Sequence, residues 1–105
     1  MAKKEIFAET TPLGQRVVLT RDRWREIVRF KHPALAGHED EVRDCVRDPD
    51  VIRASFKDNE VHMYYRTGAI GYICVVVGGD DLQARFVITA YRTKKLKKGQ
   101  ELWTK

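Results

Sequence analysis

The sequence has no long hydrophobic run, and this absence argues against a membrane-spanning helix. Its longest apolar stretch, "YICVVV" at residues 72–77, is far shorter than the roughly 18 residues that such a helix needs. The first residues, "MAKKEIFAETT", contain no apolar segment typical of a secretory signal. We therefore expect a cytoplasmic protein that has no membrane partner.

Cysteine is scarce, and the motifs of several common sites are missing. The spacing of Cys45, Cys74 and the three histidines matches neither a zinc site nor a disulfide framework, so we expect both cysteines to be buried thiols. The chain also contains no GxGxxG motif, no phosphate-binding P-loop and no serine in a nucleophile elbow. The sequence therefore predicts no metal ion and no other cofactor.

Length and charge limit the class of protein. A chain of 105 residues with 43% hydrophobic content has room for a single domain around one core. Lysine and arginine number 20 against 15 acidic residues, which gives a formal net charge of +5. This excess is compatible with a polyanionic partner such as RNA, although many basic domains are simply soluble.

Two amphipathic helices are predicted in the first half of the chain. The first begins after Thr20, a typical N-cap residue, and ends at His32-Pro33, because a residue before proline is disfavoured in a helix. Its apolar stripe consists of Trp24, Ile27 and Val28. The second helix lies within residues 37–50, and its apolar stripe consists of Val42, Cys45 and Val46.

From residue 51 onward, alternation of apolar and polar residues predicts strands. Residues 60–67 and 70–77 form two of them, separated by a tight turn at Gly68, and the second is apolar on both faces, as is typical of a central strand. Residues 1–15 are an N-terminal extension or strand, and residues 93–105 form a basic tail with a possible short edge strand. The expected architecture is α+β, a single nuclease-like domain 1–105 with N-terminal helices packed on an antiparallel sheet of about four strands.

Strand alternation also predicts a polar face of this sheet. If the helices cover the apolar set, which includes Ile52, Ala54 and Phe56, the opposite face collects Arg53, Ser55, His62, Tyr64, Arg66, Arg85, Thr89 and Tyr91. Guanidinium groups bind phosphate, aromatic rings stack on unpaired bases and hydroxyls donate to phosphate oxygens, so this face is predicted to bind RNA. The alternative is that these residues simply suit a pleated, half-exposed surface.

Two further features lie outside that face. His32 is placed by a proline turn, and imidazoles in general can give or take a proton near neutral pH, so it is a candidate general acid or base; the alternative is a histidine that caps the first helix. Lys94, Lys95, Lys97 and Lys98 follow directly on the last strand, and we expect them to steer RNA toward the polar face, the alternative being a solvated turn.

Several segments resemble a known group of proteins. The segments "VVLTRDRWREIVRFKHPAL", "VRDPDVIRAS", "MYYR", "ICVVV" and "FVITAYRTKKLKKGQELW" are similar to small phage and bacterial proteins with the barnase, EndoU, colicin and RelE type of nuclease fold. The similarity extends over residues 17–103 and implies a metal-independent RNase, often a toxin or phage effector. It also implies catalytic positions at His32, Arg66, Thr89 and Tyr91. One departure is Ala34, where the family pattern leads us to expect an acidic residue.

The predicted function is therefore metal-independent cleavage of RNA through attack by the 2′-hydroxyl. This chemistry needs a base, an acid and cations beside the phosphate. We expect His32 or His62 to transfer protons, Arg66 and Arg53 to stabilise the phosphate, Thr89 to donate a hydrogen bond to it, and Tyr91 to stack or transfer a proton. The alternatives are a non-catalytic nucleic-acid-binding module, or an interaction domain that binds an antitoxin or inhibitor protein.

Overall fold

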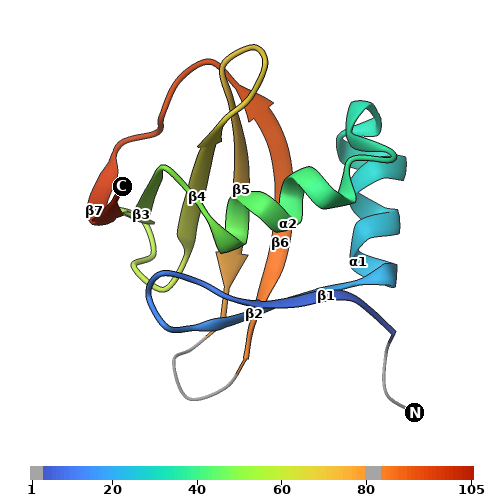
Figure 1. The fold of residues 1–105 in the computed structure, drawn as a ribbon, viewed down its shortest axis with the longest axis horizontal. Helices are drawn as coiled ribbons and strands as arrows, with labels where there is room; N and C mark the ends of the chain where they lie inside the picture. The colour runs from blue at the N-terminus through green and yellow to red at the C-terminus, as the bar shows by residue number, and fades with distance from the viewer. Residues whose placement is uncertain (1–3, 80–83) are drawn as a thin grey trace.

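The main element of the protein is a twisted sheet, seen in a computed structural model that describes residues 4–79 and 84–105 (Figure 1). Its strands in chain order are β1 (Glu5–Thr10), β2 (Arg16–Thr20), β3 (Val51–Ser55), β4 (His62–Thr67), β5 (Tyr72–Gly78), β6 (Arg85–Thr93) and β7 (Gly99–Thr104). The spatial order is β1-β2-β6-β5-β4-β3-β7. All neighbours are antiparallel except β2 and β6, which pair in parallel through Val17 with Arg85 and Val18 with Phe86.

The prediction of N-terminal helices on an antiparallel sheet of about four strands is wrong. The described residues form a seven-stranded mixed sheet and only two short α-helices, α1 (Arg21–Glu26) and α2 (Glu39–Arg47). The β1–β2 hairpin and β7 add to both edges of the predicted sheet. The hairpin is joined to it by a parallel pairing between residues far apart in the chain, which no local pattern encodes.

The first helix begins and ends for the expected reasons. The Thr20 hydroxyl accepts a hydrogen bond from the Arg23 amide at 3.2 Å, which confirms the N-cap. The helix then widens into a π-helical turn, η1 (Ile27–Lys31), closed by the His32 amide donating to the Ile27 carbonyl at 2.7 Å. Pro33 starts a short 3₁₀ turn, η2 (Pro33–Leu35), so the backbone on both sides of His32 is held.

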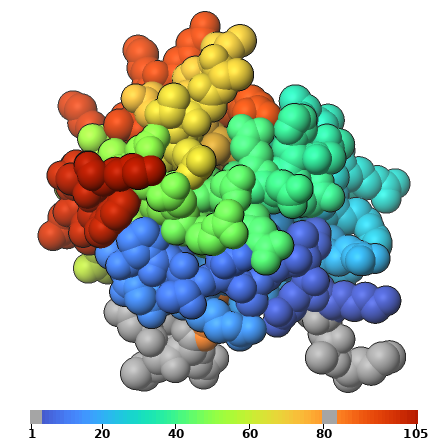
Figure 2. Space-filling model, in the orientation of Figure 1, coloured from blue at the N-terminus to red at the C-terminus, as the bar shows by residue number. Residues whose placement is uncertain are grey.

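The second helix covers one face of the sheet. Its predicted apolar stripe is confirmed, because Val42, Cys45 and Val46 have no exposed surface. In Figure 1, α2 crosses in front of the central strands, with the β1–β2 hairpin below it. Figure 2 shows that α2, the hairpin and the C-terminal strand together cover this side. We call it the helix face, and it holds the main core, which includes Ile52, Tyr64, Ile73, Val75, Val77, Val87 and Ala90.

The strand predicted to be central is confirmed as central, since β5 is fourth among the seven strands of the described sheet. Its other face contributes Cys74 to a second, smaller cluster with Met63 and Tyr65. Both cysteines are free and buried, as expected. The Cys45 thiol donates weakly to the Tyr64 carbonyl at 3.3 Å.

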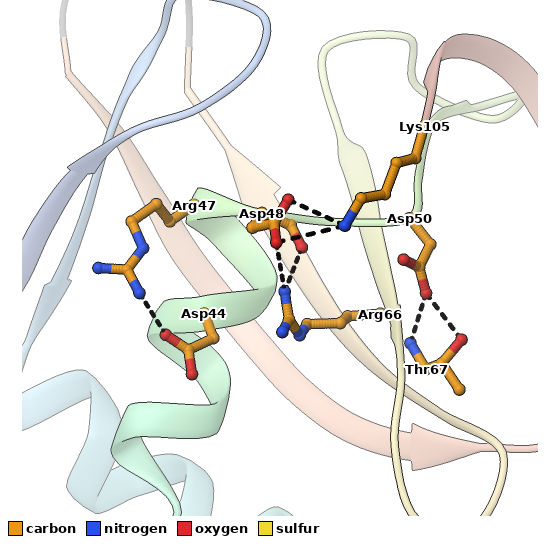
Figure 3. A network of polar contacts seen from close by, with 7 residues as sticks. All are labelled: Asp44, Arg47, Asp48, Asp50, Arg66, Thr67 and Lys105. Atoms are coloured by element: carbon orange, nitrogen blue, oxygen red, sulfur yellow. Dashed lines mark hydrogen bonds and ion pairs between the residues drawn. The ribbon is translucent and has the colours of Figure 1, made fainter.

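Polar contacts fix the end of α2 against the strands (Figure 3). Arg66 donates to the Asp48 carbonyl at 2.6 Å and to its carboxylate at 3.0 Å, and Lys105 approaches the same carboxylate at 3.3 Å. The Asp50 carboxylate accepts from the Thr67 amide and hydroxyl, both at 2.7 Å. These contacts join the C-terminus, the end of α2 and the end of β4.

Within residues 4–79 and 84–105, the helices are all too short and too polar to span a bilayer.

Candidate nucleic-acid interface

The structure divides the predicted polar face between the two sides of the sheet. Directly paired residues on neighbouring strands share a face, so Tyr65, Cys74 and Tyr91, which lie side by side in register, point away from α2. We call this side the open face. From the predicted set it carries Arg53, Ser55, Thr89 and Tyr91. The other members, His62, Tyr64, Arg66 and Arg85, lie on the helix face.

Two features of the strands explain this division. All four residues at the start of β4, from His62 to Tyr65, are buried, so apolar character alone does not show which face the helix covers. In β6 the register shifts: Thr89 pairs with Val76, but Val87 pairs with Val77. This bulge turns Val87 to the helix face, where it is 1% exposed, although simple alternation places it with Thr89.

The four residues on the helix face do not form one exposed surface, because three of them are buried. Tyr64 is fully buried, and His62 and Arg85 are 7% and 2% exposed. One Arg85 guanidinium nitrogen donates to the Glu60 carbonyl. Arg66 points toward Asp48 and Lys105 (Figure 3), on the opposite side of the sheet from Tyr91. The expected convergence of Arg66 with Tyr91 is therefore not found.

Two cationic or ionisable side chains lie near the Tyr91 ring on the open face. The His32 ring centroid is 5.7 Å from the Tyr91 ring centroid, and the Lys97 Nζ atom is 5.5 Å from the same ring. The Tyr91 and Thr89 hydroxyl oxygens are buried and have no hydrogen-bond partner of standard geometry among the described residues, although the Tyr91 hydroxyl lies beside the Cys74 thiol. Burial, followed by the neighbouring Cys74, raises the pKa of Tyr91 well above its ordinary value. Only the ring of Tyr91 is therefore available to a ligand, and its phenol is neutral.

The predicted lysine cluster is carried by an ordered loop, residues 94–98, which we call the lysine loop. Leu96 packs on the Met63, Tyr65 and Cys74 cluster. The Lys97 amide donates to the Tyr65 hydroxyl at 3.0 Å, and Arg53 donates to the Lys97 carbonyl at 2.9 Å. All four lysines remain exposed. The loop backbone is thus fixed to the sheet while its charges face solvent.

Within residues 4–79 and 84–105, no carboxylate forms an ion pair with the cations of the open face. On and around the helix face, arginines form ion pairs, namely Arg43 with Glu9, Arg47 with Asp44, Arg66 with Asp48 and Arg92 with Glu41. The lysine loop, Arg53 and Lys57 take part in none of the ion pairs between described residues. Glu101 is paired with Arg53 in register across β3 and β7, without forming such a bond. Among the described residues, one group of unpaired cations therefore surrounds the lysine loop, and a second lies along the first helix and its π-helical turn, at Arg21, Arg25, Arg29 and Lys31.

A hollow of about 360 Å³ lies beside the lysine loop. It is lined by Ser55, Phe56, Lys57, Val61, Met63, Val76, Lys97 and Lys98. The prediction that Phe56 faces the core is wrong, because β3 ends at Ser55 and Phe56 is 72% exposed. Sequence reasoning missed Phe56 and Lys57 as site residues. The signal was the turn-forming "KDN" directly after Phe56, which ends the alternation one residue early.

The described residues contain no group of three or more histidine, cysteine or acidic side chains arranged to hold a metal ion.

Comparison with protein-family models, curated proteins and solved structures gives no match for this chain. The resemblance to the nuclease-like superfamily therefore stays a prediction from the sequence motifs.

Proposed function

We propose that the open face binds single-stranded RNA. The observation that supports this most is the lysine loop, which presents four exposed ammonium groups that form no ion pair with any described residue, from a backbone fixed to the sheet. Phosphate groups bind most strongly to cations that are not already paired with a carboxylate. The release of counterions from the nucleic acid further strengthens this binding. A cytoplasmic location, where RNA is abundant, fits this function.

Unpaired RNA suits the open face better than a duplex does. Single strands offer both phosphates and the flat faces of bases, which stack on aromatic rings and guanidinium groups. The open face has an exposed aromatic ring, Phe56, next to the lysine loop. It also has the guanidinium group of Arg53, which belongs to β3, the strand that ends just before Phe56. A duplex hides its base faces and would use only the charges.

The test is an RNA titration with a charge-matched control. Replacing Lys94, Lys95, Lys97 and Lys98 by glutamine removes four charges from the open face. The control replaces Arg16, Arg21, Arg25 and Arg47 by glutamine, which removes four exposed charges outside it. Fluorescence anisotropy with a labelled single-stranded RNA measures affinity at several salt concentrations.

We expect the lysine variant to bind much more weakly and the control to bind nearly as well as the wild type. The slope of log affinity against log salt changes by about 0.7 for each phosphate contact on single strands, so loss of four contacts flattens it by roughly 3. Equal losses in the two variants would show that overall charge, and not this loop, attracts RNA. No binding by the wild-type protein at low salt contradicts the proposal entirely.

A second candidate function is metal-independent RNA cleavage, favoured by the placement of His32. The imidazole ring centroid and the Lys97 ammonium lie 5.7 Å and 5.5 Å from the centroid of the same Tyr91 ring, so an acid–base group and a cation are both near one point of the open face. In this scheme the imidazole takes the proton of a 2′-hydroxyl, whose oxygen attacks phosphorus as the bond from phosphorus to the 5′-oxygen breaks. Lys97 stabilises the charge developing at phosphorus, and a water molecule protonates the leaving 5′-oxygen. Arg66 has no part in it, because Asp48 holds that side chain on the helix face.

The cleavage test uses purified protein, RNA and EDTA between pH 5 and 8. If His32 transfers a proton, His32→Gln should lower the cleavage rate by about 10²- to 10⁴-fold while leaving RNA affinity near that of the wild type. A 2′-deoxy oligonucleotide should stay intact, since it lacks the internal nucleophile. Binding without cleavage in the wild type leaves the RNA-binding proposal in place and eliminates the catalytic one.

A further inference from the structure

We infer that the hollow beside the lysine loop holds one unpaired base of the bound RNA, stacked on Phe56, with the adjoining phosphates at Lys97 and Lys98. This inference rests on the proposed function and names the part of the RNA that the site contacts. It also assigns a role to Phe56, whose exposure the fold itself does not require.

The walls of the hollow have the chemistry of a base-binding site. Val61, Met63 and Val76 belong to the open face of neighbouring chain segments and make an apolar floor. Ser55 adds a hydroxyl, which accepts from the Lys57 amide at 3.2 Å and keeps its own proton to donate. A volume of about 360 Å³ is within the range of small-ligand sites, which is about 300–1,000 Å³.

Phe56 is the aromatic ring best placed to stack on a base here. It is 72% exposed and follows the last residue of β3, so its ring packs in neither cluster of buried residues. Every base has a flat face that stacks on such a ring. The Tyr91 ring, in contrast, already has His32 and Lys97 beside it.

Charge decides in favour of a nucleic acid over an apolar or cationic ligand. Lys57, Lys97 and Lys98 line the hollow, and none of them forms an ion pair in the described part of the chain. The base therefore contacts the apolar floor of the hollow, while the phosphates of the adjoining RNA backbone lie near the lysine ammonium groups. Duplex RNA matches the rim but has no free base to insert.

The test compares Phe56→Ala with Ile70→Ala, which removes a similarly exposed apolar side chain that lines a different hollow, beside Arg92. Each protein is titrated with a single-stranded RNA hexamer and with a duplex of the same length. A second probe carries one central 2-aminopurine, whose fluorescence is quenched by stacking. Thermal melting followed by circular dichroism checks that both variants are folded.

We expect Phe56→Ala to weaken single-strand binding by roughly 5- to 150-fold, the usual effect of losing one stacked base, and to abolish the quenching. Its salt slope should match that of the wild type, because every lysine remains. Duplex binding and the Ile70→Ala variant should be unchanged.

Three results would overturn the inference in distinguishable ways. If Phe56→Ala binds single strands as tightly as the wild type, the base lies elsewhere, while the proposed RNA-binding function stands. If Phe56→Ala weakens the binding of single-stranded and duplex RNA equally, Phe56 maintains the structure of the binding surface and does not stack on a base. If the wild-type protein binds neither RNA but does bind an acidic peptide, the occupant is a protein and the proposed function fails as well.

Discussion

The lysine loop depends on one hydroxyl group, and removing it gives a sharp test of how the interface is built. Tyr65→Phe deletes the oxygen that accepts from the Lys97 amide at 3.0 Å and that also approaches the Met63 sulfur at 3.6 Å. Burial raises the pKa of Tyr65 to about 12, so its hydroxyl group keeps its proton near neutral pH. The ring stays in place, because phenylalanine fills the same buried space.

The expected cost follows from one hydrogen bond to a partly buried amide. Losing this hydrogen bond should lower the free energy of local loop opening by about 1 kcal/mol. If the Lys97 amide exchanges through that opening, its hydrogen exchange should become roughly fivefold faster. A loop that is less ordered must be fixed when RNA binds, so we expect affinity to fall by a factor of about 3 to 10. The salt slope should not change, since all lysines are retained.

The matched control is Tyr72→Phe. Tyr72 packs edge-on against Tyr65 in the same cluster, at 6.4 Å between ring centroids, and its hydroxyl makes no hydrogen bond with any described residue. Exchange at Lys97 and RNA affinity should match the wild type. If Tyr65→Phe also leaves both quantities unchanged, the loop is not held by this hydrogen bond and the argument for a preformed cationic surface is wrong.

Three further predictions concern stability. Hydrogen bonds from Thr67 lower the pKa of Asp50, so the stability that these bonds add is present above about pH 4 and is lost as pH falls through the lowered pKa. Asp50→Asn should therefore lower the free energy of unfolding by about 1 kcal/mol at pH 7 and by much less in strong acid. Urea unfolding at both pH values measures this difference. A Cβ atom at Gly99 would lie 2.4 Å from the Ala54 carbonyl oxygen, so Gly99→Ala should cost about 1–3 kcal/mol and speed exchange in β7, and an unchanged melting temperature contradicts this. Ile73 is fully buried, so Ile73→Ala should cost about 2–5 kcal/mol in denaturant unfolding, whereas a cost below about 1 kcal/mol would place it outside the core.

Local signals in the sequence predicted local structure correctly. The Thr20 cap and the stripe of Val42, Cys45 and Val46 depend on residues three or four apart, and both are confirmed. The central position of β5 followed from its apolar character on both faces. In each case the deciding residues are close together in the chain.

Features that depend on distant residues were missed. The parallel pairing of Val17 with Arg85 joins segments that have no common sequence signal. The face of β4 that meets α2 is not marked in the sequence either, because Met63 and Tyr65 are buried like Tyr64 and pack with Leu96 of the lysine loop. Because Leu96 covers Met63 and Tyr65, the pattern of β4 did not reveal that Tyr64 and Arg66 are on the helix face.

The most direct test of the account is a map of amide chemical shifts during titration with single-stranded RNA. If RNA binds the open face, the largest changes should cluster there, at Ser55, Phe56, Val76, Tyr91 and residues 94–98. Changes centred instead on Glu41, Arg66 and Arg92 would place RNA on the helix face, and their absence throughout the described chain would mean that the surface does not bind RNA.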